Sequence, residues 1–180
     1  MSTTAAKPSS ITETVKSSKE AEAEAEHASE ETLLFLRKVG HGIPIPEECN
    51  TNRFFSNFLR SFINVHQIQR GQISCTILAK PPISNFFGTL HGGAVGSFVE
   101  VLATACARTV VAEDKELFLG EISISYLSGA PLNEEVLVNA FVVKSGRNLT
   151  VVTVEFKLKK TGNLHYIAHA TFYNMPVASL

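Results

Sequence analysis

The sequence predicts an α+β fold in which an antiparallel sheet curls around one long helix. Two short helical segments come first, followed by two strand-like runs, one long apolar helix and four further strand-like runs. Consecutive strands joined by short turns favour antiparallel pairing. The long helix carries almost no charge, so other elements must cover it nearly all round. A sheet wrapped around a single helix meets both demands.

The composition indicates a soluble protein whose charge is unevenly distributed. Sixteen basic and seventeen acidic residues give a net charge of −1 over 180 residues, which argues against a nucleic-acid partner. The first 32 residues carry a net charge of −4, and the remaining 148 carry +3. No apolar run reaches the roughly 20 residues that span a bilayer, so we expect no transmembrane segment. The three cysteines have no metal-ligand spacing and are too few for a disulfide framework, so no metal site is expected.

Three regions follow from the change in composition along the chain. Residues 1–30 are predicted to be a disordered acidic tail, 31–62 a helical lead-in and 63–176 the folded domain. The Ser- and Thr-rich start resembles an organelle transit peptide only faintly, and the C-terminal Ala178-Ser179-Leu180 lacks the basic residue of a peroxisomal address. We therefore expect a cytoplasmic protein, with peroxisome, mitochondrion or plastid as alternatives.

The lead-in is predicted to contain two short helices. Ser29 is expected to cap the first, over residues 30–39, and Gly40 to end it. Asn52 is expected to cap the second helix. Apolar residues at helical spacing give this second helix one apolar face: Phe54, Phe55, Phe58, Leu59 and Phe62.

Strand-like runs with a period of two fill most of the folded domain. The first two flank the turn at Arg70-Gly71, and alternating apolar residues mark them as half-buried strands. Six strands are predicted in all, at residues 64–69, 72–79, 120–127, 135–144, 149–159 and 164–174.

Residues 85–100 combine a glycine pair at a predicted helix start with a single acid. The helix is expected to begin near His91–Gly93, where Gly92 and Gly93 let a backbone or a ligand approach closely. Unpaired N–H groups at a helix start suit a carbonyl oxygen that develops negative charge. The alternative is that the glycines only allow close packing of the helix on the sheet.

Glu100 is the only charged residue between Gly93 and Ala107. With Ser97 and Thr104 it forms a narrow polar stripe, because residues three or four apart share a helix face. Burying an acid on an apolar helix costs free energy unless the carboxylate is paired with another group or remains in contact with water. We interpret Glu100 as a carboxylate in a cleft, suited to act as base or nucleophile. A structural acid bonded to a backbone group or an arginine is the alternative.

The spacing between the glycine pair and the acid predicts a dimer. Gly92 and Glu100 are eight residues apart, or about 12 Å along one helix at about 1.5 Å per residue. That distance is too great for both to act on one atom, so Gly92 of one chain must face Glu100 of another if both are catalytic. His91 is assigned a supporting role, with a helix cap as the alternative. Cys106 is interpreted as a buried core thiol.

The pattern Asn85-x-x-Gly88-Thr89-Leu90-His91-Gly92-Gly93, followed by Glu100, resembles the hotdog-fold thioesterases of the phenylacetate PaaI-like type. The acyl-CoA thioesterase 13 group is the most similar. The likeness covers residues 64–174 and includes Ile124-Ser125-Tyr126-Leu127 and Lys144-x-Gly146-Arg147-x-Leu149.

The resemblance implies a hotdog fold and hydrolysis of fatty acyl-CoA to free fatty acid and CoA. It implies that Glu100 is the general base or nucleophile, that the Gly92 N–H polarises the thioester carbonyl, and that Asn85 orients the attacking water. CoA would lie between subunits of a dimer or a dimer of dimers, and no cofactor is implied because CoA is part of the substrate. Residues expected to contact the substrate are Gly93, Ser97, Tyr126, Lys144, Gly146 and Arg147.

Two departures from that group keep other functions open. The group carries Asp where this chain has Glu100, and a polar Ser where this chain has Leu119. A non-catalytic acyl-CoA binding protein on the same fold is therefore one alternative. A hotdog hydratase that uses His91 with Glu100 is another, although the helix entry typical of that class is missing.

Overall fold

The computed structural model describes residues 23, 26–38 and 40–176, which divide into two compact units. The first unit contains a helix over residues 26–38 and the short 3-10 helix η1 (Glu47–Cys49). The second begins at Asn52 and contains the sheet. Residues 26–30, which the sequence analysis assigned to a disordered tail, are helical. The rest of that predicted tail, apart from residue 23, and the C-terminal Ala178–Leu180 lie outside the described residues.

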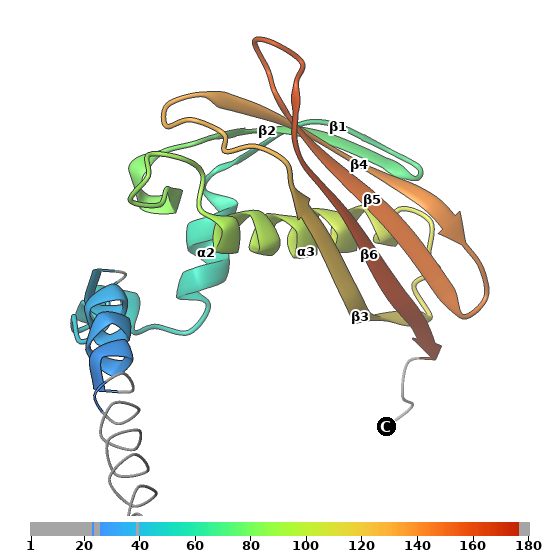
Figure 1. Cartoon of the computed structure of the whole chain (residues 1–180). Helices are drawn as coiled ribbons and strands as arrows, with labels where there is room; N and C mark the ends of the chain where they lie inside the picture. The colour runs from blue at the N-terminus through green and yellow to red at the C-terminus, as the bar shows by residue number, and fades with distance from the viewer. Residues whose placement is uncertain (1–22, 24–25, 39, 177–180) are drawn as a thin grey trace, which may run out of the picture. The chain divides into compact units, whose positions relative to one another are not determined.

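Within the described residues, six antiparallel strands form one curved sheet in the order β1-β2-β4-β5-β6-β3 (Figure 1). The six predicted strands are confirmed, but the third begins five residues earlier than expected. A bulge between Leu119 and Glu121 breaks its alternation, and this hid the first half of the strand from a period-two pattern. The bounds are β1 (Ile63–Gln69), β2 (Gln72–Leu78), β3 (Lys115–Tyr126), β4 (Glu135–Ser145), β5 (Leu149–Leu158) and β6 (Leu164–Pro176).

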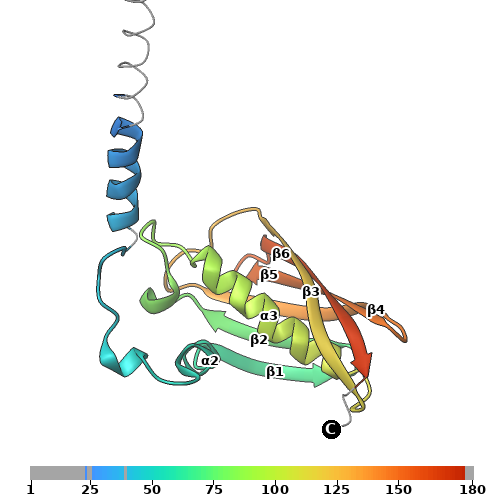
Figure 2. The same cartoon turned by 90° about the horizontal axis from the view of Figure 1, so that it is seen from below.

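The long helix α3 (Gly92–Arg108) lies in the concave side of the sheet, as Figures 1 and 2 show. Its predicted start is confirmed. One face is fully buried against the strands, since its apolar residues recur every three or four positions. These residues are Val95, Phe98, Val99, Leu102, Ala103, Cys106 and Ala107.

The opposite face of α3 is uncovered within the described residues, so the expectation of cover nearly all round is wrong for a single chain. Glu100, Val101, Ala105 and Arg108 are exposed there. Both charged residues of α3, Glu100 and Arg108, lie on this face, together with small and hydroxyl side chains.

Two predicted helix caps are wrong. The first helix already includes residues 26–28, so Ser29 lies inside it, although Gly40 follows its end with a left-handed φ of 98°. Helix α2 (Phe54–Arg60) is entered through Arg53, whose φ is 64°, and no side chain caps it. Asn52 is therefore not its cap. The structure also places α2 in the same unit as the sheet, whereas the sequence analysis grouped it with the lead-in.

Candidate active site

The loop that leads into α3 is held by the side chain of Asn85. Its Oδ1 accepts hydrogen bonds from the backbone N–H groups of Phe87 (3.1 Å) and Thr89 (3.2 Å). Its Nδ2 donates to the Thr89 hydroxyl (2.9 Å). Gly88, with a φ of 75°, supplies the left-handed turn between them. The Asn85 side chain thus fixes the loop that positions the helix start.

His91 is the N-cap of α3, which confirms the alternative of a helix cap. Its Nδ1 accepts a hydrogen bond from the Gly93 N–H (2.9 Å), and its ring is exposed. This bond satisfies one of the backbone donors that the first turn of a helix leaves unpaired.

Removing this cap is expected to destabilise the domain. Replacing His91 with alanine should lower the free energy of unfolding, measured in urea, by about 0.5–2 kcal/mol, the usual cost of losing an N-cap acceptor. His91→Asn keeps an acceptor at this position and should recover most of that loss. Equal stability of wild type and His91→Ala would contradict the cap assignment.

Gly92 presents a free N–H group at the start of α3. Gly93 N–H is bonded to His91 and Val95 N–H to the His91 carbonyl, whereas the Gly92 N–H has no acceptor among the described residues. The Gly92 carbonyl accepts a hydrogen bond from the Tyr126 hydroxyl (3.0 Å). A donor at a helix N-terminus favours an oxygen that carries negative charge.

The structure brings together Asn85, Gly92 and Tyr126 around one hollow of about 290 Å³. Ser128, Gly129 and Tyr166 also border it. Sequence reasoning missed Tyr166, whose buried hydroxyl accepts the Ala130 N–H (2.8 Å), because an alternating strand gives no sign of such a contact. A polar hollow beside a free N–H group can hold and polarise a carbonyl.

Glu100 does not share this hollow. It is exposed on the uncovered face of α3, two helical turns beyond Gly92, so the expected cleft around the carboxylate is absent from the described part of one chain. Ser97 and Thr104 flank it on the same face, as the polar stripe predicts, and the Ser97 hydroxyl donates to the Gly93 carbonyl (2.9 Å).

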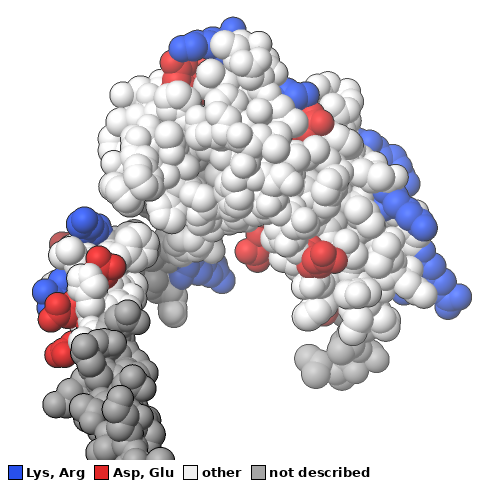
Figure 3. Space-filling view, in the orientation of Figure 1, with Lys and Arg blue, Asp and Glu red and all other residues white. Residues whose placement is uncertain are grey.

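The segment Lys144–Arg147 lies at the other end of α3. Gly146 and Arg147 line a hollow of about 180 Å³ together with Lys115 and Val110, just beyond the helix C-terminus. Since α3 is about 25 Å long at about 1.5 Å per residue, one chain does not bring this segment to Tyr126 and Gly92. Figure 3 shows Lys and Arg side chains gathered on this flank, over the turn between β4 and β5.

The outer edge of β3 is a second uncovered surface. β3 is an edge strand of 12 residues, with Tyr126 at one end and Lys115 at the other, and only β6 pairs with it within the described chain. Long unpaired edges are templates for pairing with another strand. Both β3 and the open face of α3 are therefore available to a second chain.

The remaining candidate groups are structural. Burial raises the pKa of the Cys106 thiol to about 11 and that of Cys75 to about 12, so both thiols stay protonated near neutral pH. Leu119 is half-buried against the core. In the described part of the chain, no three His, Cys, Asp or Glu side chains gather as they would around a metal ion. The helices described there are all too short or too polar to cross a membrane.

The family model and the relatives that match this chain both point to thioesterases. Residues 87–164 match the family model described as Thioesterase superfamily. Acyl-coenzyme A thioesterase 13 of Homo sapiens is 29% identical over 94 residues, which cover 52% of this chain and 66% of that protein. The match therefore spans just under two thirds of that relative's length.

Solved structures share the fold. The crystal structure of zebrafish thioesterase superfamily member 2 superposes with a TM-score of 0.63 at 25% identity, covering 69% of this chain and 88% of that one. A hypothetical thioesterase from Streptococcus pneumoniae TIGR4, solved with coenzyme A, gives a TM-score of 0.60 at 17% identity, covering 71% and 100%. The predicted hotdog fold is thus confirmed.

Proposed function

This chain contains a hotdog domain of the thioesterase superfamily, and on that premise we propose that it hydrolyses fatty acyl-CoA to free fatty acid and CoA. The observation that carries the proposal is the unpaired Gly92 N–H at the start of α3, beside the hollow that Asn85 and Tyr126 border. Homology to acyl-CoA thioesterase 13 supports the same reaction.

In the proposed mechanism, the Gly92 N–H donates to the thioester carbonyl oxygen and stabilises its negative charge as the tetrahedral intermediate forms. Glu100 takes a proton from water, whose oxygen attacks the carbonyl carbon, or it attacks that carbon directly to form an acyl–Glu100 anhydride, which a water molecule hydrolyses after CoA has left. The C–S bond then breaks, and the CoA sulfur leaves as a thiolate that accepts a proton. Water is the only co-reactant.

The site is completed by a second chain. Gly92 and Glu100 of one helix are too far apart to act on the same carbonyl. The open face of α3 and the outer edge of β3 are the two surfaces through which a second chain could bind. Antiparallel pairing of two β3 edges would bring the Lys115 end of one chain to the Tyr126 end of the other. That pairing would bring the basic segment Lys144–Arg147, with Lys115, near the first chain's Gly92, where its positive charge would suit the CoA phosphates.

Release of free CoA is the direct test of this function. Purified protein mixed with an acyl-CoA panel and a thiol reagent should release CoA far faster than buffer alone. Release at the buffer rate from every acyl-CoA would contradict the proposal.

One observation favours the alternative of a non-catalytic acyl-CoA binding protein, namely the separation of Glu100 from Gly92 within a chain. That alternative predicts saturable binding without turnover in the same assay. The hydratase alternative gains no support, because the Nδ1 of His91 already accepts the Gly93 N–H.

A further inference from the structure

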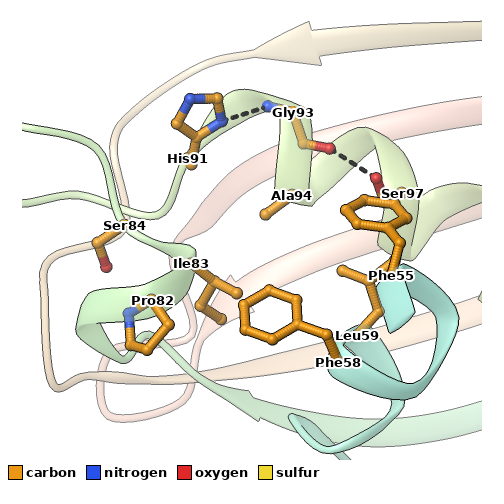
Figure 4. A pocket seen from close by; sticks show the side chains of 10 residues that line it. All are labelled: Phe55, Phe58, Leu59, Pro82, Ile83, Ser84, His91, Gly93, Ala94 and Ser97. Atoms are coloured by element: carbon orange, nitrogen blue, oxygen red, sulfur yellow. Dashed lines mark hydrogen bonds between the residues drawn. The ribbon is translucent and has the colours of Figure 1, made fainter. Parts of the chain in front are cut away.

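An apolar cavity lies on the other side of the first turn of α3 from the Gly92 hollow. It has a volume of about 420 Å³, is open to solvent on one side, and is bordered by α2, by the 3-10 helix η2 (Pro81–Ile83) and by α3. Figure 4 shows the aromatic side chains of α2 facing α3 across it. The lining residues are Phe55, Phe58, Leu59, Pro82, Ile83, Ser84, His91, Gly93, Ala94 and Ser97.

Rigid apolar groups form the inner wall of this cavity. Leu59 and Ile83 are each only 3% exposed and belong to the hydrophobic core. Phe58 is fixed between Phe54 and Phe62, with ring centroids 5.9 Å and 5.0 Å away. Phe55, by contrast, is 59% exposed and is not needed to fill the core. A preformed apolar cavity with one exposed aromatic side chain suits an apolar ligand.

The cavity adjoins the residues to which the proposed function assigns the chemistry. Gly93 and Ser97 line it, and the next residue in the chain before Gly93 is Gly92. Ser97 is also one helical turn from Glu100 on the uncovered face of α3. The end of a bound ligand that emerges from the cavity therefore lies within one or two helical turns of both Gly92 and Glu100.

We propose that the cavity between α2 and α3 receives the tail of the acyl group and limits its length. This inference rests on the proposed function. A volume of about 420 Å³ is near the lower end of the range of about 300–1,000 Å³ for small-molecule sites, so it favours medium-chain or aryl acyl groups over long chains. Since α2 lies outside residues 87–164, the segment that sets this preference is not part of the matched family domain.

Filling the cavity from the α3 side tests the proposal. Ala94→Leu adds bulk to the wall while keeping a good helix former. The kcat/KM for octanoyl-CoA, divided by that for acetyl-CoA, should fall about 10- to 200-fold, since the lost pocket contacts are worth that range. Val65→Leu adds bulk to an exposed side chain on the edge strand β1, outside the cavity and outside the surfaces proposed for self-association, and should leave the ratio unchanged.

Opening the cavity from the α2 side should have the opposite effect. Phe55→Ala removes an exposed side chain, so folding is not at risk, and should raise kcat/KM for palmitoyl-CoA relative to octanoyl-CoA several-fold. If Ala94→Leu fails to fold, as judged by its thermal melt, the chain-length profile of Phe55→Ala tests the proposal on its own. Chain-length profiles that neither variant alters would overturn the acyl cavity.

Failure of the cavity proposal can be told apart from failure of the proposed function. Wild-type protein that releases no CoA from any acyl-CoA contradicts hydrolysis. Calorimetric titration with octanoyl-CoA then still tests the cavity, because Ala94→Leu should weaken its binding at least tenfold and Val65→Leu should not. Equal binding by the two variants would overturn the cavity proposal alone.

Discussion

Replacing Glu100 with glutamine is expected to lower kcat for acyl-CoA hydrolysis by about 10²- to 10⁴-fold, the usual contribution of a general base. Glutamine keeps the size of the side chain and removes only its ability to take a proton or attack a carbonyl. Because Glu100 is exposed on the free face of α3, the free energy of unfolding should change by no more than about 0.5 kcal/mol.

A second exposed acid of the same domain provides the matched control. Glu135 lies on β4, where its carboxylate pairs with Lys159 (2.9 Å), and no role in the proposed site is assigned to it, so Glu135→Gln should retain full activity. A Glu100→Gln variant that hydrolyses acyl-CoA as fast as wild type would remove Glu100 from the mechanism, whatever its stability.

Replacing Gly92 with proline is expected to lower kcat by about 10²- to 10³-fold, the cost of losing one oxyanion donor. Proline removes the backbone N–H and is well tolerated at the first position of a helix, where that N–H makes no intrahelical bond. His91 is already extended, with ψ of 131°, as a residue before proline prefers. The fold should therefore survive the change, as a thermal melt would show.

Alanine at the same position separates the N–H from the side chain. Gly92→Ala adds a Cβ about 3.4 Å from the Tyr126 ring, which is a close van der Waals contact without a clash, and keeps the N–H. It should retain at least tenfold more activity than Gly92→Pro, measured as kcat with the same acyl-CoA. Equal losses in the two variants would show that space near Tyr126, and not the N–H donor, limits the reaction.

The elements that sequence reasoning predicted well are those whose pattern is local. The start of α3 at Gly92 and the alternation in β2 each follow from a few neighbouring residues. The caps at Ser29 and Asn52 were predicted wrongly, because a polar residue before an apolar run is only a preference and the chain entered α2 through Arg53 instead. The bulge at Leu119 likewise depends on pairing with β6, which the sequence of β3 alone does not reveal.

The residues of the candidate site show the same contrast between local patterns, which the sequence reveals, and long-range packing, which it does not. The loop from Asn85 to Gly92 is short, so its residues meet in one hollow as expected. Tyr126, the last residue of β3, borders the same hollow. The segment Lys144–Arg147 lies at the far end of α3, because the spacing of distant motifs carries no information about which end of a helix they reach. The cavity beside α2 was not predicted, since it depends on how α2 packs against α3.

Complementation between two inactive variants tests most directly whether Gly92 of one chain acts with Glu100 of another. Glu100→Gln and Gly92→Pro chains are unfolded, mixed in equal amounts and refolded together, and CoA release is compared with that of each variant alone. In a twofold dimer, random pairing leaves one intact site in each hybrid, so activity should recover to about a quarter of wild type. Activity no higher than the average of the two variants, in a mixture shown to contain hybrids, would contradict the composite site.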